Sequence, residues 1–534
     1  MDIRNIFLAG ALAFSQFLTA QTNKPITVAI FSLNDFHGAF VQNKSQGIPG
    51  APSVLQCLDS LKSVYPYNLT VAAGDNFGGS YFYNATHGVL LPVFFNDMGI
   101  RISALGNHEF DDGQKVLAEK WKNDPLRPAG WDIEYLCGNV YDQDGKVPSY
   151  LTPFTTAEIP LSPTKTLRAG FVGLLASSAK EQIRAKNIVG MIFSGNYTHV
   201  LDSIEALPAF KTVRDAEIRS LLVHIGTYMK NGKPAWTDKN EAELYAIKSP
   251  LYQSILSGHS HEPVCGRINE AGYPVVQGWW HGNYISVMKY QVDTTSMKVL
   301  SVEPEIVRVA LKDRSQLGPV PLRLQCQIDS LLASTKTKGG VPIGTKLTVA
   351  TEDMPHDRSV KYVESRMGKL VCSSFAEAFR KIAKKSDKEV IIGMSHFGSI
   401  RGGFSKGDVS VLEVGEALPF SNPLKVFKLT GRQLHDLVDF GFHNKRYGWI
   451  QTSNLETQRD ADNNVLKMTY VSPKGKRVAI KDNGTYYVCA DEFMTTGGDG
   501  YDPKFFPKSQ EVKVSLPETT DAFITYLKQQ KSIH

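Results

Sequence analysis

The sequence has no long hydrophobic run beyond its first residues. After the N-terminus of the 534-residue chain, no apolar stretch reaches the roughly 18 uninterrupted residues that a membrane-spanning helix needs. Residues 527–534, LKQQKSIH, are polar and offer no hydrophobic tail for a lipid anchor. We therefore expect the chain to have no membrane anchor.

The sequence also lacks a strong charge of one sign. It has 59 Lys and Arg against 53 Asp and Glu, which gives a net charge of +6, and it has no basic block. A solvated surface with a small bias accounts for this charge better than a nucleic-acid interface does. We therefore expect a small-molecule partner and no nucleic acid. A mild positive excess still attracts anionic substrates.

Cysteine is scarce, and no two cysteines form a C-x-x-C pair, which argues against zinc knuckles. The six cysteines can be buried thiols or can form about one to three disulfides, and sequence alone does not pair them. They are Cys57, Cys137, Cys265, Cys326, Cys372 and Cys489.

Residues 1–20 have the composition of a cleaved export signal. Arg4 supplies a positive start, and residues 6–18 are mostly apolar. Ala20 offers a small residue for cleavage, although Leu18 stands where another small residue is usual. We therefore expect a signal peptide over 1–20 and a secreted or periplasmic protein.

Residues 25–315 alternate short β-branched runs with helical or turn-rich stretches, which predicts an α/β layered domain. Near-continuous apolar strands of this kind are typical of sheets that are covered on both faces. The predicted strands span 26–33, 69–73, 167–176, 219–225 and 254–258.

A break at Gly318-Pro319 separates this domain from the rest of the chain. Residues 316–342 are predicted to form a linker helix and a hinge, and a second, smaller α/β unit is predicted over 343–525. The predicted elements of the second unit are a helix near 366–385, a strand near 388–394 and a helix near 430–441.

Polar residues gather where the predicted strands end. In an extended segment, residues two apart point to the same side, so we expect Asp35 and His37 to share a face and to chelate one ion. Ligands bind at such strand ends in open α/β sheets. Imidazole, carboxylate and amide oxygen together suit zinc, manganese or iron. The other segments are Gly74-Asp75-Asn76, Gly106-Asn107-His108-Glu109-Phe110-Asp111, Val223-His224-Ile225-Gly226 and Gly258-His259-Ser260-His261.

This ordered set resembles the calcineurin-like metallophosphoesterase superfamily, and GNHEFD followed by GHSH is similar to the 5′-nucleotidase family. The resemblance implies a four-layer α/β/β/α N-terminal domain, joined by a helix to a smaller α/β nucleotide-binding domain. It also implies two divalent ions, with zinc preferred and manganese, cobalt or iron as alternatives. The implied ligands are Asp35, His37 and His261 for one ion and Asn107, His224 and His259 for the other, with Asp75 bridging the two.

The same resemblance implies a catalytic His–Asp dyad at His108 and Asp111. Two cations that share a carboxylate lower the pKa of a bound water toward neutrality. His108 can hydrogen-bond a transferring oxygen and stabilise the charge that develops on it, and Asp111 can orient the ring of His108.

The second unit carries segments that resemble the substrate half of the same family. They are residues 395–401 (SHFGSIR), 418–422 (LPFSN) and 493–501 (FMTTGGDGY). The resemblance implies a nucleobase between Phe420 and Phe493. It also implies substrate-binding roles for Arg401, Asn422 and Asp499. The sequence departs from the family at His396, where Asn is frequent, and at Lys361, where the family has an arginine and Arg358 is a nearby candidate.

We therefore expect a secreted, metal-dependent 5′-nucleotidase, either a monomer or a homodimer, that hydrolyses nucleoside 5′-phosphates. One alternative is a related phosphoesterase that acts on nucleoside di- or triphosphates, UDP-sugars or 2′,3′-cyclic nucleotides. A non-enzymatic alternative is a protein that sequesters nucleotides, although no ligand or dyad residue is missing from the sequence. The resemblance also implies a hinge motion about residues 316–345 that carries the substrate to the metals.

Overall fold

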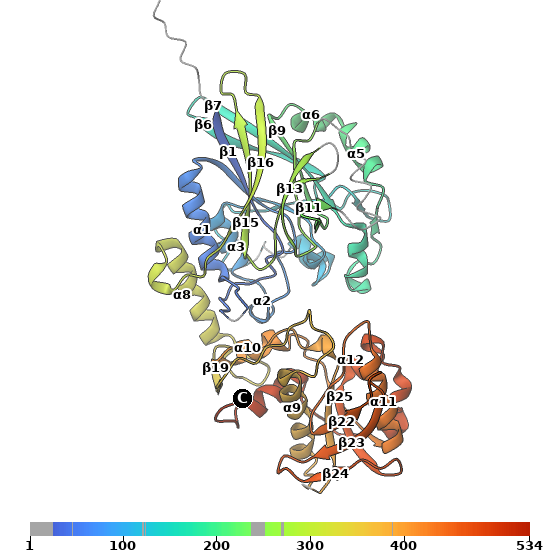
Figure 1. Ribbon diagram of the computed structural model, residues 1–534. Helices are drawn as coiled ribbons and strands as arrows, with labels where there is room; N and C mark the ends of the chain where they lie inside the picture. Colours follow the sequence, from blue (N-terminus) through green and yellow to red (C-terminus); the bar gives the residue numbers. More distant parts are fainter. Residues whose placement is uncertain are drawn as a thin grey trace, which may run out of the picture.

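The computed structural model describes residues 25–534 except residues 45, 120, 121, 123, 236–250, 269–271 and 387. It has two lobes joined by helix α8 (Pro319–Ser334) (Figure 1). The signal peptide predicted over 1–20 lies outside the described residues. Within the described ranges, no helix has both the length and the apolar character to cross a membrane. All six cysteines are free thiols.

The N-terminal lobe contains two six-stranded sheets, each of which has four neighbouring strands that run parallel. The first sheet has the order β16 (Val299–Arg308), β15 (Tyr284–Val292), β1 (Ile26–Leu33), β2 (Tyr67–Ala72), β3 (Ile102–Ala104) and β4 (Glu134–Leu136). The second has the order β13 (Pro263–Ile268), β14 (Tyr273–Gly278), β12 (Ser254–Leu256), β9 (Ile218–His224), β7 (Lys165–Leu175) and β6 (Phe154–Ser162). Each of the five predicted strands is therefore present, with small shifts at its ends.

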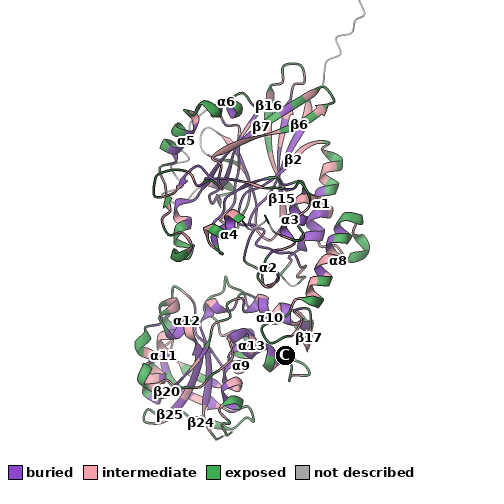
Figure 2. Cartoon of the chain, turned by 180° about the vertical axis from the view of Figure 1, so that it is seen from behind, coloured by how far each residue is buried: buried purple, intermediate pink, exposed green. Residues whose placement is uncertain are grey.

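Side chains alternate along these strands between two buried layers. In β1, Val28 and Ile30 pack in a core with Leu222 of the second sheet, so the two sheets lie face to face. Phe31 and Leu33 point the other way and pack in the core that also holds residues of α1 (Gly50–Val64). Both faces of the central strands of each sheet are thus buried (Figure 2), which explains their near-continuous apolar runs.

Helices cover the outer faces of the two sheets. Helices α1 and α3 (Leu91–Met98) lie over the first sheet, and α5 (Tyr197–Glu205) and α6 (Lys211–Arg214) lie over the second (Figure 1). This is the predicted four-layer α/β/β/α architecture. Among the described residues, the other α-helices and strands of the lobe are α2 (Tyr81–Thr86), α4 (Gln114–Glu119), β5 (Val140–Tyr141), β8 (Ile192–Phe193), β10 (Tyr228–Lys230) and β11 (Lys233–Ala235).

The C-terminal lobe is built on a four-stranded sheet in the order β20 (Leu424–Thr430), β25 (Thr485–Asp491), β18 (Ile391–Ser395) and β21 (Gln451–Thr452). Helices α9 (Arg366–Ile382) and α13 (Thr519–Leu527) pack in one core, and α11 (Gly431–His443) packs in the other. The lobe also contains β17 (Lys346–Ala350), β19 (Gly407–Ser410), α10 (Val411–Ala417), β22 (Leu455–Arg459), β23 (Val465–Val471), β24 (Arg477–Ala479) and α12 (Glu492–Thr495).

The second α/β unit is thus present, and its core extends beyond residue 525. The backbone N–H of Ile533 donates to the carbonyl of Val349, 2.9 Å away, so the end of the chain joins β17. The helix predicted near 366–385 ends at Ile382, and the strand predicted near 388–394 begins at Ile391.

The two lobes contact each other directly through α2 and α10. Gly415 of α10 lies so close to Tyr81 of α2 that an added Cβ would be 2.1 Å from Cγ of the ring. The carboxylate of Glu416 accepts a hydrogen bond from the backbone N–H of Tyr81 at 2.8 Å. The lobes are therefore joined by this contact as well as by α8.

Candidate functional site

The polar segments after β1 and β2 pair with each other. The backbone N–H of Asp35 donates to the carbonyl of Gly74, and that of His37 donates to the carbonyl of Asp75, both at 3.0 Å. These bonds hold the two segments side by side at the carboxyl ends of neighbouring parallel strands. Their side chains therefore share one space at this edge of the sheet, as the strand-end pattern predicted.

Six of the seven predicted metal ligands form two groups that share Asp75. One ligand atom each from Asp35, His37, Asp75 and His261 lies within 4.8 Å of the others, and the same holds for Asp75, His224 and His259. The seventh predicted ligand, Asn107, is buried, and its Oδ1 atom has no hydrogen-bond partner among the described residues. The next residue, His108, donates its backbone N–H to Asp75 Oδ1 at 2.8 Å, which keeps Asn107 beside the shared carboxylate.

The donor set fits a pair of divalent cations. His224 Nδ1 lies 2.8 Å from the carbonyl of Ala73, which fixes Nδ1 as the donor and leaves Nε2 facing Asp75 Oδ2 at 3.1 Å. Although burial alone lowers it, the charges of Asp75 and Asp35 raise the pKa of His224 to about 10. With two buried carboxylates beside its histidines, the cluster is consistent with a dimetal site of nitrogen and oxygen ligands.

The backbone of this cluster is in an unusual conformation. Asp35, His37, Asp75, His259 and His261 all have positive φ angles, between 49° and 90°. Non-glycine residues adopt such angles at a cost of about 1–3 kcal/mol each, and they gather at functional sites. The expectation that Asp35 and His37 share a face of an extended segment is therefore wrong in its geometry. The two side chains converge because both residues are in the left-handed conformation of a turn.

The predicted dyad lies next to the cluster. His108 Nδ1 is 2.8 Å from Asp111 Oδ2, and the ring of His108 is 4.9 Å from the ring of His37, centroid to centroid. Burial lowers the pKa of His108, but Asp75 and Asp111 outweigh it and raise that pKa to about 9. The imidazole is partly exposed, so its other nitrogen is free to meet a substrate.

Glu109 is a functional residue to which the sequence analysis gave no role. Its buried carboxylate accepts hydrogen bonds from the backbone N–H groups of Asp75, Asn76 and Gly106 at 2.8–3.0 Å. Burial, together with the charge of Asp75, raises the pKa of Glu109 to about 7. The carboxylate thus ties the Asp75 loop to the Asn107 loop. The signal available in the sequence was an acidic residue inside an otherwise tight Gly-Asn-His turn.

All five predicted substrate residues line one cavity of about 520 Å³ in the C-terminal lobe: Arg401, Phe420, Asn422, Phe493 and Asp499. Phe420 and Phe493 are each 45% exposed, which is unusual for phenylalanine and leaves part of each ring open to a ligand.

Two further contacts shape this cavity. His396 Nδ1 lies 2.5 Å from Asp499 Oδ2, so the histidine that departs from the family pattern holds the predicted ribose-binding carboxylate. The guanidinium of Arg401 lies over the ring of Phe420, 4.9 Å from its centroid. Burial and the neighbouring charge of Arg358 lower the pKa of Arg401 to about 10.

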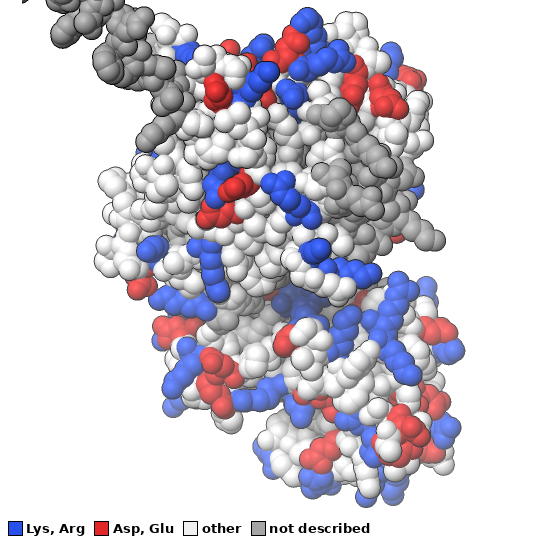
Figure 3. Space-filling view, turned by 45° about the horizontal axis from the view of Figure 1, so that its top comes forward, with Lys and Arg blue, Asp and Glu red and all other residues white. Residues whose placement is uncertain are grey.

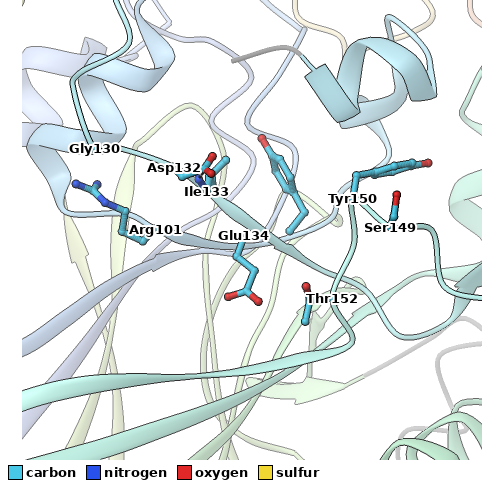
Figure 4. Close-up of a pocket in the computed structure, with 9 residues that line it drawn as sticks. Arg101, Gly130, Asp132, Ile133, Glu134, Ser149, Tyr150 and Thr152 are labelled. Carbon is cyan, nitrogen blue, oxygen red and sulfur yellow. Dashed lines mark hydrogen bonds between the residues drawn. The ribbon is translucent and has the colours of Figure 1, made fainter. Parts of the chain in front are cut away.

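Another cavity of about 460 Å³ lies beside β4, between Arg101 and Tyr150 (Figure 4). It contains none of the predicted site residues, and its polar side chains do not converge on a common point (Figure 4). His281 stacks on Trp280 at 4.0 Å between ring centroids, and its backbone N–H donates to the backbone carbonyl of Asp35. We assign His281 a packing role.

Family models match both lobes of the chain. The model for calcineurin-like phosphoesterases matches residues 29–263, and the model for the 5′-nucleotidase C-terminal domain matches residues 342–505. Endonuclease YhcR of Bacillus subtilis is 23% identical over 526 residues, which cover 94% of this chain and only 40% of that longer protein. The 5′-nucleotidase of Vibrio cholerae is 22% identical and covers 90% of this chain, with 87% of its own length aligned.

A solved structure shares the fold of the whole chain. The 5′-nucleotidase precursor from Thermus thermophilus aligns with a TM-score of 0.63 at 21% identity, covering 95% of this chain and 97% of that one. Both lobes and their order along the chain therefore have a structural counterpart. The chain belongs to the 5′-nucleotidase family, as a phosphoesterase domain with a dimetal-like His/Asp cluster followed by a 5′-nucleotidase C-terminal domain.

Proposed function

We propose that this chain is a metal-dependent 5′-nucleotidase that hydrolyses nucleoside 5′-phosphates to a nucleoside and inorganic phosphate. The observation that carries the proposal is the pairing of two sites in one chain. One is a buried cluster in which Asp75 belongs to two ligand groups, and the other is a cavity with two exposed phenylalanine faces. The cluster suits a phosphoryl group, and the cavity suits a nucleoside.

In this proposal Asp35, His37 and His261 would hold one cation, Asn107, His224 and His259 would hold the other, and Asp75 would be available to both. Zinc, manganese, cobalt and iron all accept such ligands. When bound, the cations supply Lewis acidity and an activated water for attack on phosphorus.

The dyad performs a separate task in this proposal. Its contact with Asp111 fixes the ring of His108 and leaves Nε2 as the atom that meets the substrate. From there, His108 can donate a hydrogen bond to a phosphoryl oxygen and a proton to the leaving oxygen. Asp111 acts through His108 as a positioning residue.

In the C-terminal lobe, Phe420 and Phe493 stack on the base in this proposal, and base stacking on an aromatic side chain contributes about 1–3 kcal/mol. Asn422 hydrogen-bonds the base, Asp499 accepts from a ribose hydroxyl, and Arg401 contacts the phosphate or the ribose. The nucleotide is then the partner of the chain. We further propose that the enzyme acts outside the cytoplasm, since residues 1–20 have the composition of an export signal.

The test is phosphate release from AMP by the purified chain, with EDTA and after Zn²⁺ or Mn²⁺ is restored, beside His108→Ala. We expect release that depends on metal and that falls by roughly a hundredfold or more in the variant. The metal content of the variant, measured by mass spectrometry, should equal that of the wild type, because His108 is not among the proposed ligands.

Other outcomes assign the site differently. Hydrolysis of p-nitrophenyl phosphate without hydrolysis of any nucleotide would keep the phosphoesterase and reject the nucleotidase. Nucleotide binding without hydrolysis of any ester would favour a sequestering protein.

A further inference from the structure

A cavity of about 470 Å³ lies where the two lobes and the linker helix meet. Residues between 38 and 48, which follow β1, and Phe82 of α2 line it from the N-terminal lobe. Residues between 405 and 416, on β19, α10 and the turn before them, line it from the C-terminal lobe. Figure 1 shows α2, α8, α10 and β19 together at this junction. Among the described residues around the cavity, none is a predicted ligand or substrate residue, so it is separate from the proposed site.

The cavity also lies on the predicted hinge. Leu332, near the end of α8, and Gly344, two residues before β17, both line it, and both fall within residues 316–345. Its walls therefore come from both lobes and from the segment about which the lobes are expected to rotate. A rotation of one lobe must change the shape of this cavity.

The inner wall of the cavity is largely apolar. Phe40 and Phe82 are each 1% exposed, and their ring centroids lie 5.9 Å apart. Buried Ile48 and Leu412 and half-buried Leu332 extend this wall. An apolar cavity of this size with a few polar groups is typical of sites for small organic molecules.

Two carboxyl groups of α10 interrupt the apolar wall. Glu413 and Glu416 both line the cavity, and their spacing of three residues places them on one face of the helix. Glu413 Oε2 accepts a hydrogen bond from the backbone N–H of Ser410 at 2.7 Å. Glu416 Oε1 accepts from the backbone N–H of Tyr81, and Oε2 has no hydrogen-bond partner among the described residues. The cavity therefore presents at least one open acceptor oxygen.

No cation balances these two carboxyl groups. Within the part of the chain that the structure describes, neither Glu413 nor Glu416 forms an ion pair, and no cation lowers the pKa of either group. Two lysines line the cavity, but both are exposed to solvent. Lys44 pairs with Asp313 at 2.9 Å, and Lys406 is not within ion-pair distance of either glutamate.

The acidity belongs to the cavity and not to the surface around it. Burial raises the pKa of Glu416 to about 7 and also raises the pKa of Glu413. On the face seen in Figure 3, basic side chains gather instead where the two lobes meet. An ammonium group beside the two carboxyl groups would supply the missing positive charge and a donor for Oε2 of Glu416.

We propose that this cavity binds a small organic amine, with its ammonium group beside the two carboxyl groups of α10 and its apolar body against the two phenylalanine rings. The bound amine holds the lobes in the arrangement seen here, because a rotation separates the walls of its site. A ligand that binds one arrangement better than another shifts the population toward it.

The amine is therefore an inhibitor if turnover needs the lobes to move. That consequence rests on the proposed nucleotidase function, whereas binding of the amine does not. Nucleotide and amine occupy different cavities, so a saturating nucleotide concentration should not displace the amine.

The binding test uses 2-phenylethylamine, 2-phenylethanol and 3-phenylpropionate, which share an apolar body and carry a positive, no and a negative charge. NMR titration of the metal-loaded full chain compares the wild type with Glu416→Gln, Glu413→Gln and the control Asp436→Asn. Glutamine keeps an acceptor oxygen for the backbone N–H of Tyr81 or Ser410 and removes the charge. Asp436 is exposed on α11 and does not line the cavity.

We expect the wild type to bind the amine roughly tenfold more tightly than the alcohol, and the carboxylate more weakly still. Glu416→Gln and Glu413→Gln should each lose roughly tenfold in affinity for the amine, the effect of losing one charge-assisted hydrogen bond, and keep their affinity for the alcohol. Asp436→Asn should bind all three as the wild type does. Equal affinity for amine and alcohol, or unchanged amine affinity in both glutamine variants, would overturn the inference.

The effect on turnover is measured as AMP hydrolysis at rising concentrations of 2-phenylethylamine. The amine should lower kcat, and both glutamine variants should need roughly tenfold more amine for the same fractional loss. Inhibition that AMP overcomes would place the amine in the nucleoside cavity and overturn the inference, and undiminished turnover at saturating amine would overturn its hold on the lobes. If the wild type hydrolyses no nucleotide but binds the amine with the expected charge dependence, the proposed function fails and the amine site stands.

Discussion

At the scale of single residues, the His/Asp ligand cluster is organised by a side chain that does not belong to it. Glu109 accepts backbone hydrogen bonds from three positions, two after β2 and one after β3. Its carboxylate has only acceptor oxygens, which is what three converging N–H donors require. The positions of Asp75 and Asn107 therefore depend on a carboxyl group that lies outside the set of predicted ligands.

We predict that Glu109→Gln weakens this site without removing a ligand. The amide group would turn an N–H donor toward one or two backbone N–H groups, and an unsatisfied buried donor costs about 1–3 kcal/mol. We expect a lower thermal midpoint and a lower metal affinity, measured by calorimetry and by competition with a chelator. Glu181→Gln, on an exposed residue, is the control. Unchanged metal affinity would show that Glu109 does not position the ligands.

At the scale of elements, the contact between α2 and α10 depends on one carboxyl group. Glu416 of α10 accepts from the backbone N–H of Tyr81 at the start of α2, and Asp521 is the other acid near Tyr81. Burial raises the pKa of Glu416 from 4.5 to about 7, although the backbone hydrogen bonds oppose the rise. A carboxyl group with a raised pKa binds its proton more tightly in the packed state than in the unfolded state.

The sign of the resulting pH dependence follows from linkage. The stabilisation by protonated Glu416 is complete below about pH 4.5 and is lost as the pH rises through about 7. In the wild type, the free energy of unfolding should fall between about pH 5 and pH 8 as Glu416 loses its proton. We predict that this fall is about 2 kcal/mol smaller in Glu416→Gln. Calorimetry at both pH values measures this change. Asp408→Asn, an exposed carboxylate of the same lobe, should leave the fall as it is in the wild type.

At the scale of the whole molecule, the two halves of the proposed site are separate in this arrangement. No residue of the ligand cluster lines the nucleoside cavity within the described part of the chain. A nucleotide held by Phe420 and Phe493 therefore reaches the metals only if the lobes move. The α8 helix and the small α2–α10 contact allow such a rotation (Figure 1).

We predict that locking the α2–α10 contact stops turnover. Tyr81 and Gly415 touch, so a disulfide in the double variant Tyr81→Cys, Gly415→Cys would fix the lobes as they are here. The oxidised protein should lose AMP hydrolysis by about tenfold or more, and a reductant should restore it. Oxidised Tyr81→Cys alone controls for the six native thiols. Full activity in the locked protein would contradict the need for lobe motion.

Much of this architecture could be predicted from the sequence alone. Strands such as β1 and β7 carry apolar side chains on both faces. Only a sheet that is covered on both sides can bury such strands, and the five main strands were predicted for that reason. The ligand residues were predicted because they follow those strands in an ordered set. The resemblance to a known family also assigned the dyad and the substrate residues, and the cavity brings all five substrate residues together.

Other features depended on contacts between segments far apart in the chain. The left-handed conformations of Asp35 and His37 are enforced by hydrogen bonds to the next strand's loop, and local pattern predicted an extended segment instead. The role of Glu109 depends on backbone partners that only the folded chain brings near it. The sequence by itself determined which elements form and which residues end them, because hydrophobic periodicity is local. Tertiary structure alone decided which charges meet across the lobes, because charges become neighbours only when the chain packs.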